Sequence, residues 1–306
     1  MGFMQPSFSN IFPGFLIVVR RHKVTINNIS KRLSPLRLYA TLAPLKGINM
    51  AIICGIDLEG INQNLELSGV NLSKDRVIEI GAALWDFDLQ APVRVLSELI
   101  DEPDHLPITE LVSDLTGITD DMLEKWGAKK DQIKSILLSL ADMMEKADYM
   151  MAHNGDQYDK PMIGAMFNRF GIPMPDLLWI DSIRDIEFPR KIKVRALSQL
   201  EHAHGFVNPF PHRALSDVFS MLKIAAHYNL DRMVELAKSP LVTIEAKLPT
   251  PNWKDPIQMK QFNAEKHKVS RAKFKWNPSN KTWTKIVHQI RLDEGKISFD
   301  FEWALK

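Results

Sequence analysis

The chain has 306 residues, of which 45% are hydrophobic and 25% are charged, proportions that exclude a disordered or fibrous protein and allow one large or two modest domains. Its single cysteine excludes an internal disulfide framework and is typical of a protein from a reducing compartment. No apolar run approaches the ~20 residues that span a bilayer, so we expect no membrane segment.

Charge is distributed unevenly along the chain, although the formal net charge is only +2. Residues 1–50 contain seven basic residues and no acidic ones, and residues 245–306 contain 13 basic against 7 acidic residues. Residues 51–244 therefore hold 19 basic and 30 acidic residues, a balance of −11. An acidic domain by itself repels nucleic acid, so metal ions and a basic appendage would have to compensate if nucleic acid is the partner.

Residues 1–49 form a basic N-terminal extension without a sustained helical or strand period. Rich in arginine and free of acids, the extension matches the composition of an organelle transit peptide, which would direct the protein to the mitochondrial matrix. Met50 directly precedes the first predicted strand, so a true translation start at that residue is the competing explanation. We favour the second explanation and expect a cytoplasmic protein.

The first predicted element is a strand at residues 52–59, an apolar run that ends in the carboxylates Asp57 and Glu59. Because side chains alternate between the faces of a strand, these two residues point the same way. Two like charges at the end of a buried strand are costly unless a cation or a proton compensates them. Alternatively, both side chains have left the core and are solvated.

The following elements predict an α/β fold. Short connections between the first three strands favour antiparallel hairpins, and the later strands alternate with helices. Strands are predicted at 52–59, 76–85, 93–100, 149–152 and 177–181, and helices after the N-cap Thr119 and at 133–146, about 159–170, 197–204 and 211–228. The pattern predicts a mixed five-stranded sheet with helices on both faces.

The C-terminal part differs in composition from the rest. Pro249, Pro251 and Pro256 predict a linker at 239–256, and residues 257–306 are predicted to be a basic, aromatic-rich accessory module that contains β-structure. Lysines alternate with aromatic residues around a turn at 277–280, which indicates a hairpin. Its tryptophans, Trp276 and Trp283, could stack on the bases of a bound strand, or they could form the core of a small β-domain.

The order of motifs resembles the DEDD superfamily of 3′→5′ exonucleases, in its DnaQ-like, histidine-containing (DEDDh) branch, which has a ribonuclease H-like fold. The resemblance covers about residues 50–230, so we expect the catalytic domain at 50–238. It is carried by Asp57-Leu58-Glu59, by His153-Asn154 followed by Tyr158-Asp159, and by His212 with Asp217.

The resemblance implies hydrolysis of phosphodiester bonds at single-stranded 3′ ends to nucleoside 5′-monophosphates, with single-stranded DNA favoured. Two divalent ions about 3.5–4 Å apart supply the nucleophile and neutralise charge in such chemistry, and Mg²⁺ or Mn²⁺ prefers carboxylate ligands. By resemblance, Asp57 would bridge both ions, Glu59 and Asp217 would complete one site, and Asp159 would hold the other. The residues expected to contact the substrate are Leu58, Gly60, Asn154, Tyr158, Trp276 and Trp283.

His212 is the candidate general base, because an imidazole exchanges protons near neutral pH. Five helical residues turn through about 500°, which would leave His212 and Asp217 about 140° apart if both were helical. We therefore expect His212 on a loop before the helix and Asp217 in the first turn. His153, by contrast, is expected to be structural.

Several alternatives remain open. Asp159 could be only a helix N-cap, and Asp217 only a solvated acid in a first helical turn. Gly60 stands where the family usually has threonine, and the inserted Asp156 rivals Asp159 as a ligand. The protein could also be an RNA exonuclease or a non-catalytic nucleic-acid-binding protein of the same fold. A polymerase or a repair protein could be a partner, and the sequence does not determine the oligomeric state.

Overall fold

The computed structural model describes residues 18–19, 22–23, 51–61 and 70–306. The chain divides into two compact units, residues 1–49 and 50–306. In the first unit the structure describes only β1 (Val18–Val19) and β2 (His22–Lys23), which pair antiparallel. The transit-peptide and start-site hypotheses otherwise concern residues outside the described ranges. Within those ranges, no helix is long and apolar enough to cross a membrane.

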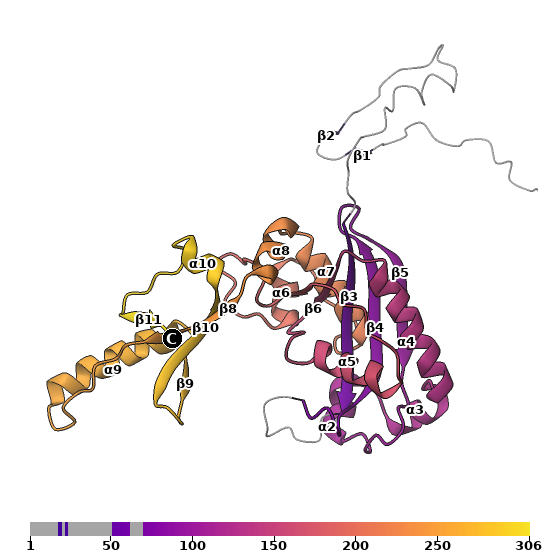
Figure 1. Ribbon diagram of the computed structural model, residues 1–306, viewed down its shortest axis with the longest axis horizontal. Helices are drawn as coiled ribbons and strands as arrows, with labels where there is room; N and C mark the ends of the chain where they lie inside the picture. Colours follow the sequence, from indigo (N-terminus) through magenta and orange to yellow (C-terminus); the bar gives the residue numbers. More distant parts are fainter. Residues whose placement is uncertain (1–17, 20–21, 24–50, 62–69) are drawn as a thin grey trace, which may run out of the picture. The chain divides into compact units, whose positions relative to one another are not determined.

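A mixed sheet of five strands forms the centre of the second unit (Figure 1), in the order β5-β4-β3-β6-β7. The strands are β3 (Ile52–Ile61), β4 (Arg76–Asp86), β5 (Ala91–Leu99), β6 (Tyr149–Ala152) and β7 (Trp179–Asp181). β3 pairs antiparallel with β4 and parallel with β6. The predicted mixed sheet is therefore confirmed, and the strand with the two carboxylates is central.

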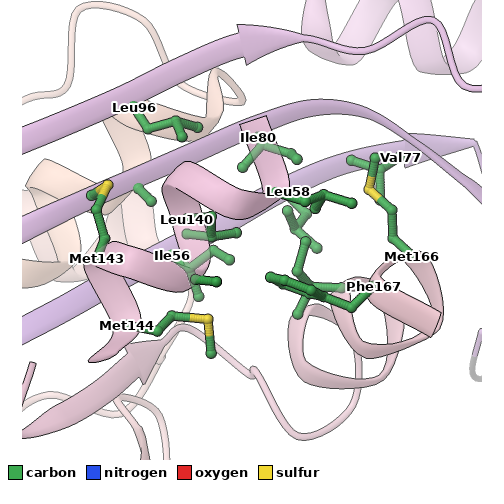
Figure 2. Close-up of a cluster of buried hydrophobic side chains, with 14 of the residues drawn as sticks. Ile56, Leu58, Val77, Ile80, Leu96, Leu140, Met143, Met144, Met166 and Phe167 are labelled. Atoms are coloured by element: carbon green, nitrogen blue, oxygen red, sulfur yellow. The ribbon is translucent and has the colours of Figure 1, made fainter. Parts of the chain in front are cut away.

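Helices cover both faces of this sheet, as predicted. They are α2 (Glu110–Thr116), α3 (Asp120–Trp126), α4 (Lys130–Glu145), α5 (Asp159–Arg169), α6 (Leu197–Ala203), α7 (Ala214–Ala225) and α8 (Leu230–Lys238). On one face, Ile56 and Leu58 of β3 pack against Leu140 of α4 and Phe167 of α5 (Figure 2). On the other face, Ile53 packs with residues of α6, α7 and α8. This alternation leaves the α7 face of β3 to Asp57 and Glu59.

Helix boundaries show where the sequence was less informative. The run at 211–228 starts with the loop that holds His212, and α7 begins only at Ala214, because His212 has a φ of 59° and cannot be part of a right-handed helix. The short helices α2 and α8 were not predicted. Each starts at a side-chain cap, Thr109 and Asn229 respectively; the seven residues of α2 are too few for a clear period, whereas α8 does show one, with apolar residues at 230, 233, 234 and 237.

The C-terminal module is a second, smaller sheet with the order β11-β8-β10-β9. Its elements are β8 (Leu241–Ala246), α9 (Pro256–Arg271), β9 (Lys275–Asn277), β10 (Thr282–His288), α10 (Gln289–Asp293) and β11 (Trp303–Leu305). The expected linker at 239–256 is thus wrong in part, because β8 lies within it and pairs with β10 and β11. The module begins near Leu241, and within the expected linker residues 247–255 connect β8 to α9.

The two tryptophans of the predicted hairpin have different environments. The hairpin forms as β9 and β10, with Trp276 directly opposite Trp283. Trp283 packs against the module's core, which contains Ile244, Val269 and Phe274, whereas Trp276 is 47% exposed. The core explanation therefore holds for Trp283, and Trp276 remains open to a ligand.

Candidate active site

The site is built on β3, where Asp57 and Glu59 share one face. Both side chains are half-buried, so neither has moved into solvent as the alternative required. Glu59 lies opposite Glu79 of β4, and the register of the pair shifts directly after Glu59. The shift is typical of a bulge, which re-aims the side chains at a strand end.

Asp159 approaches the pair from α5. It is the first residue of the helix, is 2% exposed, and its Oδ1 accepts the backbone N–H of Leu58 at 3.0 Å. That contact places it beside the strand segment between Asp57 and Glu59. The N-cap position belongs to Tyr158, so the capping explanation for Asp159 is wrong. Its rival Asp156 forms an ion pair with Arg184 at 2.6 Å.

His212 and Asp217 approach from the N-terminal end of α7. His212 lies on the loop before the helix, as predicted, and its backbone N–H donates to Oδ2 of Asp217 at 3.1 Å. Asn208 donates its side-chain N–H to Oδ1 of the same carboxylate at 2.6 Å. Gly81 of β4 makes this approach possible, because a Cβ there would lie 2.2 Å from the backbone nitrogen of Leu215.

The carboxylates of β3 and the residues at the start of α7 meet at one point. Ligand atoms of Glu59, His212 and Asp217 all lie within 4.8 Å of one another. Burial raises the pKa of Asp57 well above its usual range, and the charges of Asp159, Glu59 and Asp217 raise it further. The four carboxylates therefore converge as predicted, and Asp217 is not merely a solvated acid of a first turn.

The donor set fits a divalent cation. Burial, together with Asp217 and Glu79, raises the pKa of Glu59 to about 8, and burial raises that of Asp217 to about 6. Such carboxylates must hold protons or be compensated by positive charge near neutral pH. Hard ions such as Mg²⁺ and Mn²⁺ prefer these oxygen ligands. The single thiol does not compete, since Cys54 lies on the opposite face and burial raises its pKa to about 12.

Metal-free protein is expected to lose stability as the pH rises from about 5 to about 8. The pKa of Glu59 is raised from 4.5 to about 8 in the folded state, so the folded protein binds more protons than the unfolded chain across this window. Stability therefore falls as those protons leave. Thermal unfolding in chelator at pH 5, 6.5 and 8 measures the loss, and Mn²⁺ or Mg²⁺ added at pH 8 should reverse it. A melting temperature that rises over this range in chelator would contradict the raised pKa values.

Two of the predicted substrate contacts are explained by how the side chains pack. A Cβ at Gly60 would lie 2.4 Å from the hydroxyl oxygen of Tyr158, so glycine is required for the ring to reach this position. The tyrosine hydroxyl thus occupies the space beside residue 60, where the family usually carries a threonine side chain.

Asn154 is exposed, with a φ of 67°, and its backbone N–H donates to Asp181 at 3.3 Å.

The expectation for Leu58 is wrong, whereas the expectation for His153 agrees with the structure. Leu58 was expected to contact substrate, but its side chain is 3% exposed and lies in the core on the opposite face (Figure 2). That expectation is wrong for the side chain, because the alternation that brings Asp57 and Glu59 together sends Leu58 the other way. His153 is structural, as expected. Its Nδ1 pairs with Ser182 Oγ at 2.8 Å, and burial lowers its pKa to about 4.

Sequence reasoning missed Glu79 and Arg213, which fix the loop of His212. The guanidinium of Arg213 donates to the buried Glu79 carboxylate at 2.7–3.2 Å, and the Ala214 N–H donates to the same carboxylate at 2.9 Å. A charged residue in the middle of the otherwise apolar segment 77–85 was the available signal, since such a group needs a partner.

Glu79→Gln is expected to lower the rate of hydrolysis by about 10- to 100-fold, the usual effect of removing a partner that orients a ligand. The amide keeps the shape but loses the charge that holds Arg213, and with it the residue next to His212. Steady-state kinetics should place the loss in kcat with little change in KM. Glu98→Gln, an exposed carboxylate on the neighbouring strand β5, is the matched control. If Glu79→Gln and Glu98→Gln hydrolysed the substrate at equal rates, Glu79 would not orient the His212 loop.

Comparison with solved structures finds distant similarity. The nuclease domain of 3′hExo, described as a DEDDh family member bound to rAMP, has 18% identity and a TM-score of 0.47, covering 59% of this chain and 92% of that chain. E. coli exonuclease I in complex with single-stranded DNA has 15% identity and a TM-score of 0.47, covering 65% of this chain and 48% of that chain. No match to a curated protein was found.

The sequence itself matches a family model. The RNase T model, described as an exonuclease, covers residues 56–225, more than half of the chain. The matched range runs from β3 to the last residue of α7 and includes Asp57, Glu59, Asp159, His212 and Asp217. The chain therefore belongs to the RNase T exonuclease family and is an exonuclease with a mixed five-stranded α/β fold.

Proposed function

We propose that this exonuclease removes nucleotides one at a time from single-stranded 3′ ends, with DNA favoured over RNA, and releases nucleoside 5′-monophosphates. The observation that carries the proposal is the convergence of Glu59, His212 and Asp217 within 4.8 Å, with Asp57 and Asp159 beside them on β3 and α5. A carboxylate cluster of this kind beside an exposed imidazole suits hydrolysis of a charged ester.

The carboxylates would hold two divalent ions, with Asp57 shared between them. Glu59 and Asp217 would complete one position, and Asp159 the other. Bound there, Mg²⁺ or Mn²⁺ would neutralise phosphate charge, orient the attacking water and stabilise the leaving oxygen. The support for this assignment is electrostatic, because burial and mutual repulsion raise the pKa values of these acids and leave the cluster in need of positive charge.

His212 acts as the general base in this proposal. Its imidazole accepts the proton of the attacking water while the water oxygen forms a bond to phosphorus and the bond from phosphorus to the 3′-oxygen breaks, and the released 3′-oxygen takes a proton from solvent. The products are a nucleoside 5′-monophosphate and a strand with a new 3′-hydroxyl. The exposed position of His212 leaves room for the terminal phosphate, and its backbone bond to Asp217 keeps the loop over the carboxylates.

The test uses single-stranded DNA and RNA of the same sequence, labelled at the 5′ end, with Mg²⁺, with Mn²⁺ and in chelator. We expect a ladder that shortens from the 3′ end, mononucleotide 5′-phosphates as products, faster loss of DNA than of RNA, and no reaction in chelator. Faster degradation of RNA would replace DNA by RNA as the substrate, the alternative that the site residues equally allow. Internal cleavage, or shortening of a 3′-labelled strand from its 5′ end, would refute the proposal.

A further inference from the structure

The C-terminal module contains a cavity of about 590 Å³ lined by aromatic side chains. Trp276 and Trp283 contribute from the β9–β10 hairpin, Phe262 from α9, and Trp253 from the segment that leads into α9. The ring centroids of the first pair lie 5.6 Å apart, and those of Trp253 and Phe262 lie 5.7 Å apart. The volume falls within the range of pockets that hold ring-containing ligands.

The cavity leaves large indole surfaces open to solvent. Trp253 is 64% exposed and Trp276 is 47% exposed. Module stability does not require this exposure, because a separate core of Ile244, Val269 and Phe274 is already buried. Flat aromatic side chains that remain open beside one cavity are suited to stacking on the faces of bases, an interaction that tolerates any base sequence.

The module that contains the cavity carries a net positive charge. Lys247 and Lys281 line it, and residues 245–306 carry 13 basic against 7 acidic residues. Glu245 and Glu302 also line the cavity, and Glu245 is compensated by Lys247 at 2.7 Å and by Lys306 at 3.7 Å. A nucleic-acid backbone would find here the positive charge that the acidic residues 51–244 do not provide.

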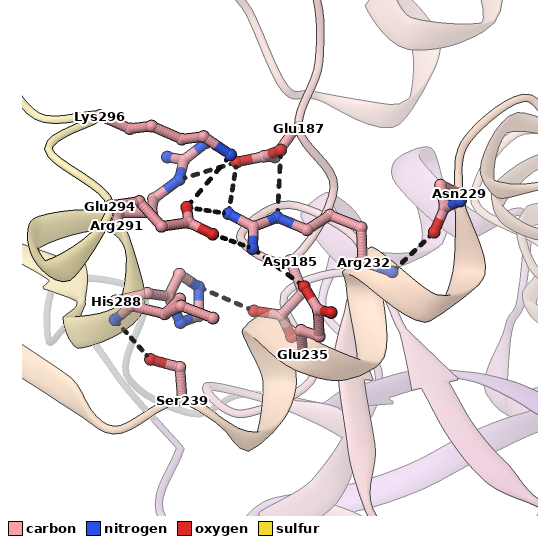
Figure 3. A network of polar contacts seen from close by, with 11 residues as sticks. Asp185, Glu187, Asn229, Arg232, Glu235, Ser239, His288, Arg291, Glu294 and Lys296 are labelled. Atoms are coloured by element: carbon pink, nitrogen blue, oxygen red, sulfur yellow. Dashed lines mark hydrogen bonds and ion pairs between the residues drawn. The ribbon is translucent and has the colours of Figure 1, made fainter.

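The module is fastened to the catalytic part through an ion-pair network (Figure 3). Arg232 of α8 binds Glu187 and also Glu294, which follows α10, and Arg291 of α10 binds the same Glu187. His288, at the end of β10, lies 3.0 Å from the buried Asp185. These contacts tie the last strand of the hairpin to the catalytic part of the chain, so the cavity is held in place.

One branch of this network reaches the edge of the active site. The second carboxylate oxygen of Asp185 accepts the N–H of Asp181, at the end of β7, at 2.7 Å. Asp181 in turn accepts the N–H of Asn154, at 3.3 Å. The module is therefore anchored to the same short segment that positions Asn154 at the site.

We propose that this aromatic cavity is a second binding site for single-stranded nucleic acid, in which Trp253 and Trp276 stack on bases of the substrate strand upstream of its 3′ end. Lys281 would neutralise an adjoining phosphate. The identification of the strand as substrate rests on the proposed function, whereas the binding itself does not. The module then gives the enzyme affinity for long strands that the acidic catalytic part alone would repel.

The experiment measures binding of labelled 20-nucleotide oligo-dT and oligo-rU to full-length protein in chelator, where the strand is not consumed. Trp276→Ala and Trp253→Ala should each weaken binding by about 5- to 150-fold, the usual effect of removing one base-stacking ring. Trp126→Ala, an exposed tryptophan on α3, is the matched control and should bind like the wild type. Lys281→Gln should reduce the salt dependence of binding by about 0.7 in log–log slope.

The outcomes separate the two proposals. Wild-type protein that shortens strands, together with unchanged affinity in both tryptophan variants, would overturn the cavity and leave the proposed function standing. Protein that shortens neither DNA nor RNA, but whose binding depends on Trp276, would overturn the proposed function and leave the cavity as a binding site. If a proline-rich peptide occupies the cavity and fails to compete with the oligonucleotides, the occupant is a protein segment and the assignment to nucleic acid is wrong.

Discussion

Asp57→Asn is expected to abolish hydrolysis of single-stranded nucleic acid in Mg²⁺ or Mn²⁺, with a loss above the roughly 10²–10³-fold that follows removal of one stabilising donor in other enzymes. The substitution removes the carboxylate that both ions would share. It also relieves the repulsion among the four acids, since the charges of Asp159, Glu59 and Asp217 raise the pKa of Asp57. The fold should therefore remain, and the metal-free variant should melt at a higher temperature than the wild type at pH 8.

Two measurements check this expectation. Single-turnover rates at saturating Mn²⁺ report the chemical step, and thermal unfolding with and without Mn²⁺ reports the loss of metal binding. Asp156→Asn is the matched control, because Asp156 lies three residues before the candidate ligand Asp159 but pairs with Arg184. If the Asp57→Asn enzyme kept an appreciable fraction of the wild-type rate, the proposal that two ions share Asp57 would be wrong.

His212→Ala is expected to lower the rate by about 10²- to 10⁴-fold, the usual contribution of general acid–base catalysis. The imidazole is exposed beside the carboxylates, and alanine removes the proton acceptor while leaving the backbone bond to Asp217 available.

The readout must separate catalysis from binding. Oligonucleotide affinity of His212→Ala in chelator should stay close to that of the wild type, and Mn²⁺ should still raise its melting temperature. His202→Ala is a suitable control, because His202 is an exposed histidine of α6 whose Nδ1 pairs with the backbone oxygen of Ser198. If His212→Ala kept its rate and lost only affinity, the residue would be a substrate contact and not the base.

The sequence by itself determined the central sheet and the direction of several side chains that the structure brings together. Alternation along 52–59 placed Asp57 and Glu59 on one face, and the same periodicity should have warned that Leu58 points into the core. The helical angle between His212 and Asp217 was enough to place the histidine outside α7, where the structure has it. These features are local, because strand and helix periods fix the direction of a side chain over a few residues.

Tertiary structure alone decided which groups meet from distant parts of the chain. The choice of Asp159 over Asp156 depends on a bond to the backbone of Leu58, and the placing of the His212 loop depends on Glu79 and Arg213. The same holds for β8, whose pairing with β10 and β11 moved the start of the module into the expected linker. Local periods say nothing about such pairings, because partners separated by many residues are selected by packing, hydrogen bonding and charge compensation only once the chain has folded.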